Sequence, residues 1–173
     1  MTGRKYSLEE RKEIYSRPLE EQFEVVYKED KAIVFRHIIR STERADYGIV
    51  LSVAIAIAKE NNSSVWLLPE INIHEQALRL KLGLSTINGY TPDIMLAKGS
   101  FVDVKCPESV SKITANACKA SRQGGVACIT NHSASLEVGL LDKYAKWVIS
   151  SQGYKYSEVY FYLDGVLYKR ARD

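Results

Sequence analysis

The stretch Thr91–Pro107, TPDIMLAKGSFVDVKCP, constrains the fold more than any other part of the chain. Two short apolar runs flank a Lys98-Gly99-Ser100 turn, which predicts a β-hairpin. Alternate residues of a strand share a face, so Asp103 and Lys105 are expected to point the same way. If the turn is centred near its glycine, Asp93 falls roughly opposite Lys105. The sequence therefore predicts a hairpin that presents two carboxylates and an ammonium on one face.

Such a hairpin carries the groups that metal-assisted phosphodiester hydrolysis uses. A divalent cation neutralises phosphate charge and activates water, and Mg²⁺ (or Mn²⁺) prefers oxygen ligands such as the carboxylates of Asp93 and Asp103. Lys105 would then orient or deprotonate the attacking water, or stabilise the charge that develops on the phosphate. The alternative is a cross-strand salt bridge on an exposed sheet face, which would contribute little to stability.

The remaining patterns place helices and strands around this hairpin. Helices are predicted over residues 7–17, 42–61, 74–82, 109–123 and 136–150, and strands over residues 23–27, 32–37, 64–68, 126–130, 158–163 and 166–170. Helices that pack on a mixed central sheet bury these apolar faces economically. The prediction is a single α/β domain over residues 1–173, with a core at about 42–130, an N-terminal helix and hairpin at 7–37, and a C-terminal helix and hairpin at 136–170.

Composition limits the class of protein. A chain of 173 residues with 46% hydrophobic and 26% charged residues is typical of one globular domain. The net charge of +3 does not by itself indicate a nucleic-acid partner. The three cysteines, Cys106, Cys118 and Cys128, form no CxxC pair, so they predict buried thiols rather than disulfides or a zinc site. Without a signal-peptide pattern or a membrane-spanning apolar run, the sequence predicts a soluble cytoplasmic protein with no membrane partner.

A family resemblance follows from these residues. Pro92-Asp93 and then Asp103-Val104-Lys105 resemble the signature of the PD-(D/E)XK nuclease superfamily. The order of elements from Thr42 to Thr130 is also similar to that superfamily's core. More specifically, the runs LLPEIN, TPDIM and VDVKCPES, followed by a helix that ends in Gln-Gly, resemble C-terminal tRNase toxin domains of contact-dependent inhibition proteins. Similar domains occur in phage and mobile-element proteins.

The resemblance implies a role for each matching residue. It makes Asp93 and Asp103 metal ligands and Lys105 the catalytic lysine. Members often add an upstream glutamate, for which Glu70 is the candidate and Glu43 or Glu60 the alternatives. It also implies Mg²⁺ or Mn²⁺ as cofactor, RNA (tRNA) ahead of DNA as substrate, and a cognate inhibitor protein as partner.

The helix expected after Ser109 carries a polar stripe that predicts substrate binding. Its residues recur at helical spacing and comprise Lys112, Asn116, Lys119 and Gln123. Lysines on this face would hold a nucleic-acid backbone without reading its sequence. The alternative is an ordinary solvated helix face. Gln123 stands out because the resembling toxins tend to have a glutamine at this helix end.

Two other functions stay open at this stage. A metal-independent ribonuclease of the barnase, EndoU or RelE type would need a general acid and base, often histidine. The available histidines are His37, which follows Arg36 and precedes Arg40, and the distant His74 and His132. The second alternative is a nucleic-acid-binding or structural domain of a mobile element, in which the hairpin acids form salt bridges.

Overall fold

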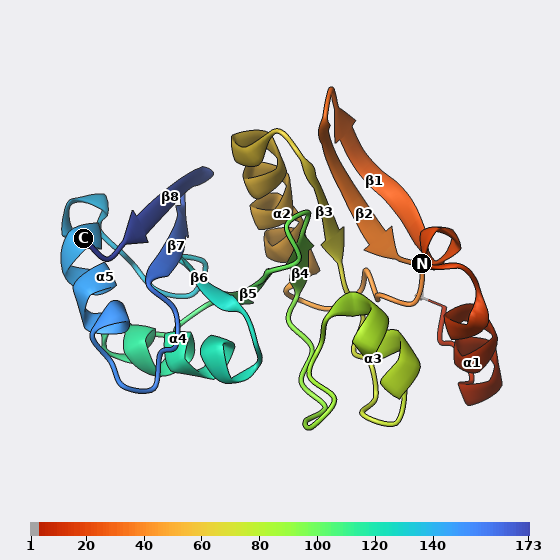
Figure 1. Ribbon diagram of the computed structural model, residues 1–173. Coiled ribbons are helices and arrows are strands. Elements are labelled where there is room, and N and C mark those ends of the chain that lie inside the picture. The colour runs from red at the N-terminus through yellow and green to blue at the C-terminus, as the bar shows by residue number, and fades with distance from the viewer. Residues whose placement is uncertain (1–3) are drawn as a thin grey trace. The chain divides into compact units, whose positions relative to one another are not determined.

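A computed structural model describes residues 4–173, and they form two compact units that adjoin in the sequence at Gly99 and Ser100 (Figure 1). Each unit combines four strands with helices, so the predicted α/β fold class is confirmed. The division falls in the predicted Lys98-Gly99-Ser100 turn, where Gly99 has a φ of 88° and its N–H donates to the Leu96 carbonyl.

The first unit has a mixed sheet in the order β1-β2-β3-β4. The pairs β1–β2 and β3–β4 are antiparallel, and β2–β3 is parallel. The strands are β1 (Phe23–Glu29), β2 (Ala32–His37), β3 (Ser64–Leu67) and β4 (Ile94–Leu96), and the helices are α1 (Leu8–Ser16), α2 (Tyr47–Asn61) and α3 (Gln76–Leu82), with a 3-10 turn at Leu19–Gln22. The strand positions agree with the sequence pattern to within two residues.

Two helices of this unit show how local sequence sets its boundaries. Helix α1 begins with the predicted capping box, in which the Ser7 hydroxyl accepts from the Glu10 N–H and the Glu10 carboxylate accepts from the Ser7 N–H. Helix α2 begins at Tyr47 rather than at the predicted Thr42. The Ser41 hydroxyl accepts the Glu43 N–H at 3.2 Å, and this local turn competes with an earlier helix start.

In the second unit the strands lie in the order β5-β6-β7-β8. The pairs β5–β6 and β6–β7 are parallel, and β7–β8 is antiparallel. The strands are β5 (Phe101–Lys105), β6 (Val126–Thr130), β7 (Glu158–Leu163) and β8 (Val166–Ala171), and the helices are α4 (Ile113–Arg122) and α5 (Leu141–Ile149), preceded by 3-10 turns at Val110–Lys112 and Val138–Leu140. The turn at Asp164 and Gly165 has positive φ at both residues, as the predicted tight hairpin requires.

Helices α4 and α5 pack on this second sheet and bury its core (Figure 1). The core joins Ile113 and Ala117 of α4 to Tyr144 and Val148 of α5 and to Phe161 of β7. The predicted helix cap at Ser109 is wrong. Its hydroxyl contacts the Ser111 hydroxyl instead of a backbone N–H, and a 3-10 turn delays the start of α4.

Two further predictions concern membrane-spanning helices and the cysteine thiols. No helix among residues 4–173 is long and apolar enough to cross a membrane. All three cysteines are free thiols, as their spacing predicts. Cys128 is buried on β6, whereas Cys106 and Cys118 are half-buried, so the prediction that all three are buried is only partly right.

Candidate functional site

Strand β5 ends in a buried ion pair. The Lys105 ammonium lies 2.7 Å from the Asp103 carboxylate, and their side chains are 15% and 4% exposed. The contact confirms that the two side chains share one side of the strand, as their spacing predicts. Because both are largely buried, the pair is not the exposed salt bridge of the alternative interpretation. Burial of an ion pair is costly, and such pairs are often kept for a role other than stability.

Gln123 completes this group from the end of α4. The Lys105 ammonium donates to the Gln123 side-chain oxygen at 2.5 Å. Gln123 follows the last residue of α4, and its own N–H donates to carbonyls of the last helical turn. Three residues selected from the sequence, Asp103, Lys105 and Gln123, are therefore brought together within the second unit. We call them the β5 triad.

Two glycines after α4 allow this approach. Gly124 has a φ of 91°, which ends the helix in a left-handed conformation that favours glycine. Gly125 lies against β5, where an added Cβ would stand 2.9 Å from the Asp103 backbone nitrogen. No side chain fits at that distance. The Gly-Gly pair therefore lets β6 begin directly beside Asp103, and keeps the helix end near Lys105.

The rest of the predicted stripe on α4 is more ordinary. Lys112 and Lys119 are exposed, and Asn116 donates to the Lys112 carbonyl at 2.8 Å within the helix. Exposed lysines suit either a solvated face or contacts with a phosphate backbone. Their role in substrate binding stays a prediction.

In the first unit, Asp93 lies directly before β4 and contacts Arg40. The two guanidinium nitrogens of Arg40 lie 3.2 and 3.3 Å from one Asp93 carboxylate oxygen, and Arg40 also donates to the Leu68 carbonyl at 2.7 Å. The two side chains are 5% and 15% exposed. Sequence reasoning did not foresee this pair, because Arg40 follows a different strand and lies far from Asp93 in the chain.

Glu70, the proposed third acid, is a surface group. Its side chain is 86% exposed and lies 3.3 Å from the Arg44 guanidinium. The predicted ligands Glu70, Asp93 and Asp103 are all carboxylates, the donors that Mg²⁺ prefers, so their chemistry fits the ion. Within neither unit do three or more His, Cys, Asp or Glu side chains of residues 4–173 form a group that could hold a metal. The shared metal site of these three acids stays a prediction.

Arg79 organises the segment that leads to Asp93, and sequence reasoning missed it. It is fully buried on α3, where its guanidinium donates at 2.6 Å to each of three backbone carbonyls, those of Ile71, Ser85 and Tyr90. It therefore ties the segment before α3, at Ile71, to the loop between α3 and β4, at Ser85 and Tyr90. The only available signal was an arginine beside the apolar Leu78 in a short helix, which is also the pattern of a surface residue.

His37 is a structural residue. It is fully buried, its Nδ1 accepts the Ile39 N–H at 3.2 Å, and its Nε2 therefore carries the proton that is donated to the Gln22 side-chain oxygen at 3.0 Å. Burial lowers its pKa from 6.5 to about 4. Both ring nitrogens are used within the first unit, so His37 is not available as the general acid or base of a metal-independent ribonuclease.

This burial predicts a pH dependence of stability. The unfolded chain takes up a proton at His37 below pH 6.5, whereas the folded chain does so only near pH 4, so the free energy of unfolding should fall as the pH falls through this window. The full effect is about 3 kcal/mol. Urea unfolding from about pH 7 to about pH 4.5 measures it. His37→Gln should flatten this dependence, and an equally steep dependence in that variant would contradict the assignment.

Comparison with known proteins gives a likeness of fold. The chain is similar to a chain of the CdiA-CT/CdiI toxin and immunity complex from Burkholderia pseudomallei, with a TM-score of 0.51 and 13% sequence identity. The likeness covers 76% of this chain and 88% of that chain. No protein-family model matches the sequence, and no curated protein matches it significantly. At this level of identity the likeness concerns the fold alone: the chain has the α/β fold found in a toxin–immunity complex.

Proposed function

We propose that the chain is a metal-dependent nuclease that hydrolyses phosphodiester bonds in RNA, with tRNA as the preferred substrate, and acts in the cytoplasm as a toxin or mobile-element effector. The observation that carries this proposal is the β5 triad. A largely buried carboxylate and ammonium lie at the end of a strand, where a glutamine from the end of the following helix accepts from the ammonium. Burial of such charges costs stability, and groups of this kind cluster at functional sites.

Lys105 is the residue that acts on the substrate in this proposal. The Lys105 ammonium donates to Gln123 and forms an ion pair with Asp103. An ammonium has three N–H donors, so Lys105 can also donate to a phosphate oxygen or to the attacking water. Because the two acceptors fix the position of the ammonium before substrate arrives, its charge is preorganised for the negative charge that develops on the phosphate. Asp103 and Gln123 thus position Lys105.

Asp103, Asp93 and Glu70 are the proposed ligands of Mg²⁺ or Mn²⁺. When bound, such an ion neutralises phosphate charge and lowers the pKa of a water ligand. Asp93 and Glu70 each contact an arginine in the first unit, so metal binding there would exchange one positive partner for another. The exposed Glu70 can make this exchange at little cost, whereas the half-buried Asp93 keeps a fixed orientation through Arg40.

The toxin assignment and the inhibitor partner rest on the likeness of fold. A chain of a toxin and immunity complex shares this fold over most of its length, and the sequence motifs resemble tRNase toxin domains. We therefore include a cognate inhibitor protein among the proposed partners. Such an inhibitor would bind this chain tightly and stop cleavage.

The proposal is tested by incubating the purified chain with total tRNA and with DNA, in Mg²⁺ or Mn²⁺ and in excess chelator. We expect RNA cleavage that requires the ion and stops when it is chelated. Undiminished cleavage in chelator with 2′,3′-cyclic phosphate ends would instead support a metal-independent ribonuclease. Binding of RNA without cleavage, weakened by substitution of Lys112 and Lys119, would support the non-enzymatic alternative.

A further inference from the structure

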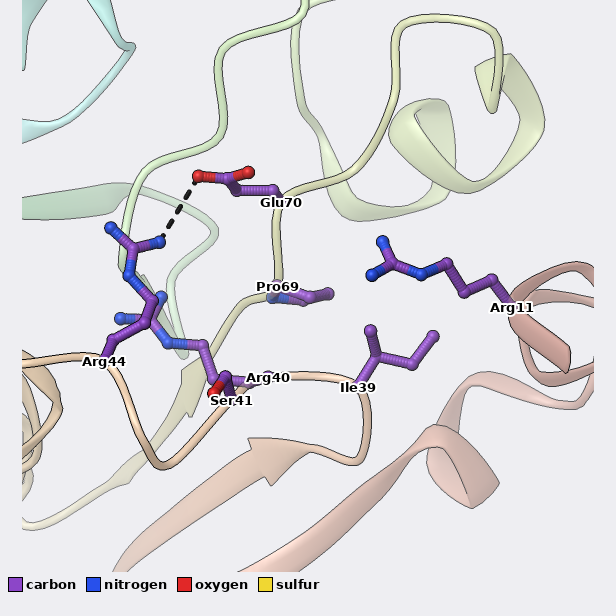
Figure 2. Close-up of a pocket in the computed structure, with 7 residues that line it drawn as sticks. All are labelled: Arg11, Ile39, Arg40, Ser41, Arg44, Pro69 and Glu70. Atoms are coloured by element: carbon purple, nitrogen blue, oxygen red, sulfur yellow. Dashed lines mark hydrogen bonds and ion pairs between the residues drawn. The ribbon is translucent and has the colours of Figure 1, made fainter. Parts of the chain in front are cut away.

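A pocket in the first unit gathers arginines from separate segments. It has a volume of about 130 Å³, and its polar lining comprises Arg11, Arg40, Ser41, Arg44 and Glu70 (Figure 2). Figure 2 shows Arg11 reaching toward the pocket from α1 and Arg44 lying on the other side of Pro69. The volume is well above the roughly 10–15 Å³ that one water needs, so a phosphate group fits.

The three arginines of this pocket differ in how far they are already neutralised. Arg40 is buried and committed to Asp93 and a backbone carbonyl. Arg44 is 48% exposed and shared between Asp46 at 3.4 Å and Glu70 at 3.3 Å. Arg11 has no ion-pair partner among residues 4–173, and only its Nε donates, weakly, to the Tyr6 carbonyl. Arg11 is therefore the arginine of this pocket whose charge has no acidic partner among residues 4–173, and Arg44 is held only by long ion pairs.

We propose that this pocket binds a backbone phosphate of the RNA substrate, with Arg11 and Arg44 as its ligands and Glu70 as a carboxylate that competes for Arg44. A planar guanidinium pairs well with phosphate oxygens, often through two hydrogen bonds. The Ser41 oxygen accepts the Glu43 N–H, so its own O–H remains as a further donor. Glu70, nearly fully exposed at the pocket, contacts Arg44 through one long ion pair that a phosphate can replace.

This inference rests on the proposed function, because it takes the phosphate to belong to an RNA substrate. Free phosphate offers the same chemistry, and the experiment separates the two sources. Binding is measured in chelator, where no metal-dependent cleavage takes place and any metal role of Glu70 is absent. The probes are a labelled single-stranded RNA oligonucleotide, followed by fluorescence anisotropy, and inorganic phosphate, followed by its displacement of that RNA.

Variants that remove positive charge inside and outside the pocket test the two arginines. Arg11→Gln combined with Arg44→Gln should weaken RNA binding about tenfold and reduce the slope of log K against log salt by about one. Lys12→Gln removes a positive charge from the neighbouring position of α1, outside the pocket, and should change binding less than about twofold. Equal effects of the double variant and of Lys12→Gln, or no RNA binding by the parent chain, would overturn the inference.

Glu70 gives an independent test with the opposite sign. Glu70→Gln removes the competing carboxylate and should tighten RNA binding about fivefold, whereas Glu20→Gln, an exposed acid of the same unit, should not. If Glu70→Gln bound RNA more weakly than the parent chain, the proposal that Glu70 competes with phosphate for Arg44 would be overturned. If phosphate binds in the parent chain but RNA binding is unaffected by the double variant, free phosphate is the ligand and the RNA assignment is overturned. If the chain showed these binding results but did not cleave RNA, only the proposed nuclease activity would be rejected.

Discussion

Lys105→Met should reduce RNA cleavage by about 10²–10³-fold, the loss that follows removal of one preorganised donor from a transition state. The substitution also leaves the Asp103 carboxylate, 4% exposed, without its ammonium partner. Breaking a buried pair on one side costs about 3–5 kcal/mol of unfolding free energy. Cleavage of tRNA in Mg²⁺ and urea unfolding should therefore both be measured on this variant.

A second variant separates lost chemistry from lost folding. In Asp103→Asn combined with Lys105→Met, no buried charge of the pair remains, so most of the unfolding free energy should return while cleavage stays at least as low as in Lys105→Met. Lys155→Met, an exposed lysine of the same unit, serves as the matched control and should cut at the parent rate. Cleavage by the folded double variant at near the parent rate would exclude the β5 triad as the catalytic group.

Arg79→Met should lower the free energy of unfolding by about 3–5 kcal/mol. The methionine fills much of the volume but leaves the carbonyls of Ile71, Ser85 and Tyr90 without their donor. The bond to Ile71 is buried and the other two are part-buried, and a buried carbonyl left unpaired costs about 1–3 kcal/mol. Urea unfolding gives the magnitude, and hydrogen exchange should show faster exchange between α3 and β4.

Arg79→Lys provides the matched comparison for this prediction. Lysine keeps the charge and three donors, but its single nitrogen cannot reach carbonyls arranged around a planar fork. It should therefore recover only part of the lost stability. Arg122→Met, which removes an exposed arginine, should change the unfolding free energy by less than about 0.5 kcal/mol. An Arg79→Met variant as stable as that control would show that water replaces the guanidinium, and the clamp would be rejected.

Local pattern was sufficient for most elements of the fold. Strand-like apolar runs and the turn residues that bound them predict β2, β6 and β7 at their observed residues, and the capping box at Ser7 predicts the start of α1. The pairing of Asp103 with Lys105 followed from strand periodicity alone. These predictions succeed because they depend on neighbours within a few residues, where backbone geometry dictates which side chains meet.

Predictions that depend on distant segments were weaker. The starts of α2 and α4 were placed too early because Ser41 and Ser109 bond within local turns, which competes with helix formation. Arg40 and Arg79 were missed as partners because burial of an arginine depends on carbonyls and carboxylates that the chain brings from elsewhere. Arginines are mostly exposed in proteins, so composition and spacing do not indicate that a particular arginine is buried.

The glycine pair after α4 has a consequence for recognising related sequences. An acid-x-lysine motif alone occurs by chance in many strands. Here the motif can reach its glutamine only if the next residue reverses the helix and the one after it carries no side chain, as Gly124 and Gly125 do. Asp103, Lys105, Gln123 and the two glycines thus form a compound signature with a steric cause. A homologue that has the motif but carries a larger residue at position 125 is expected to have lost the site.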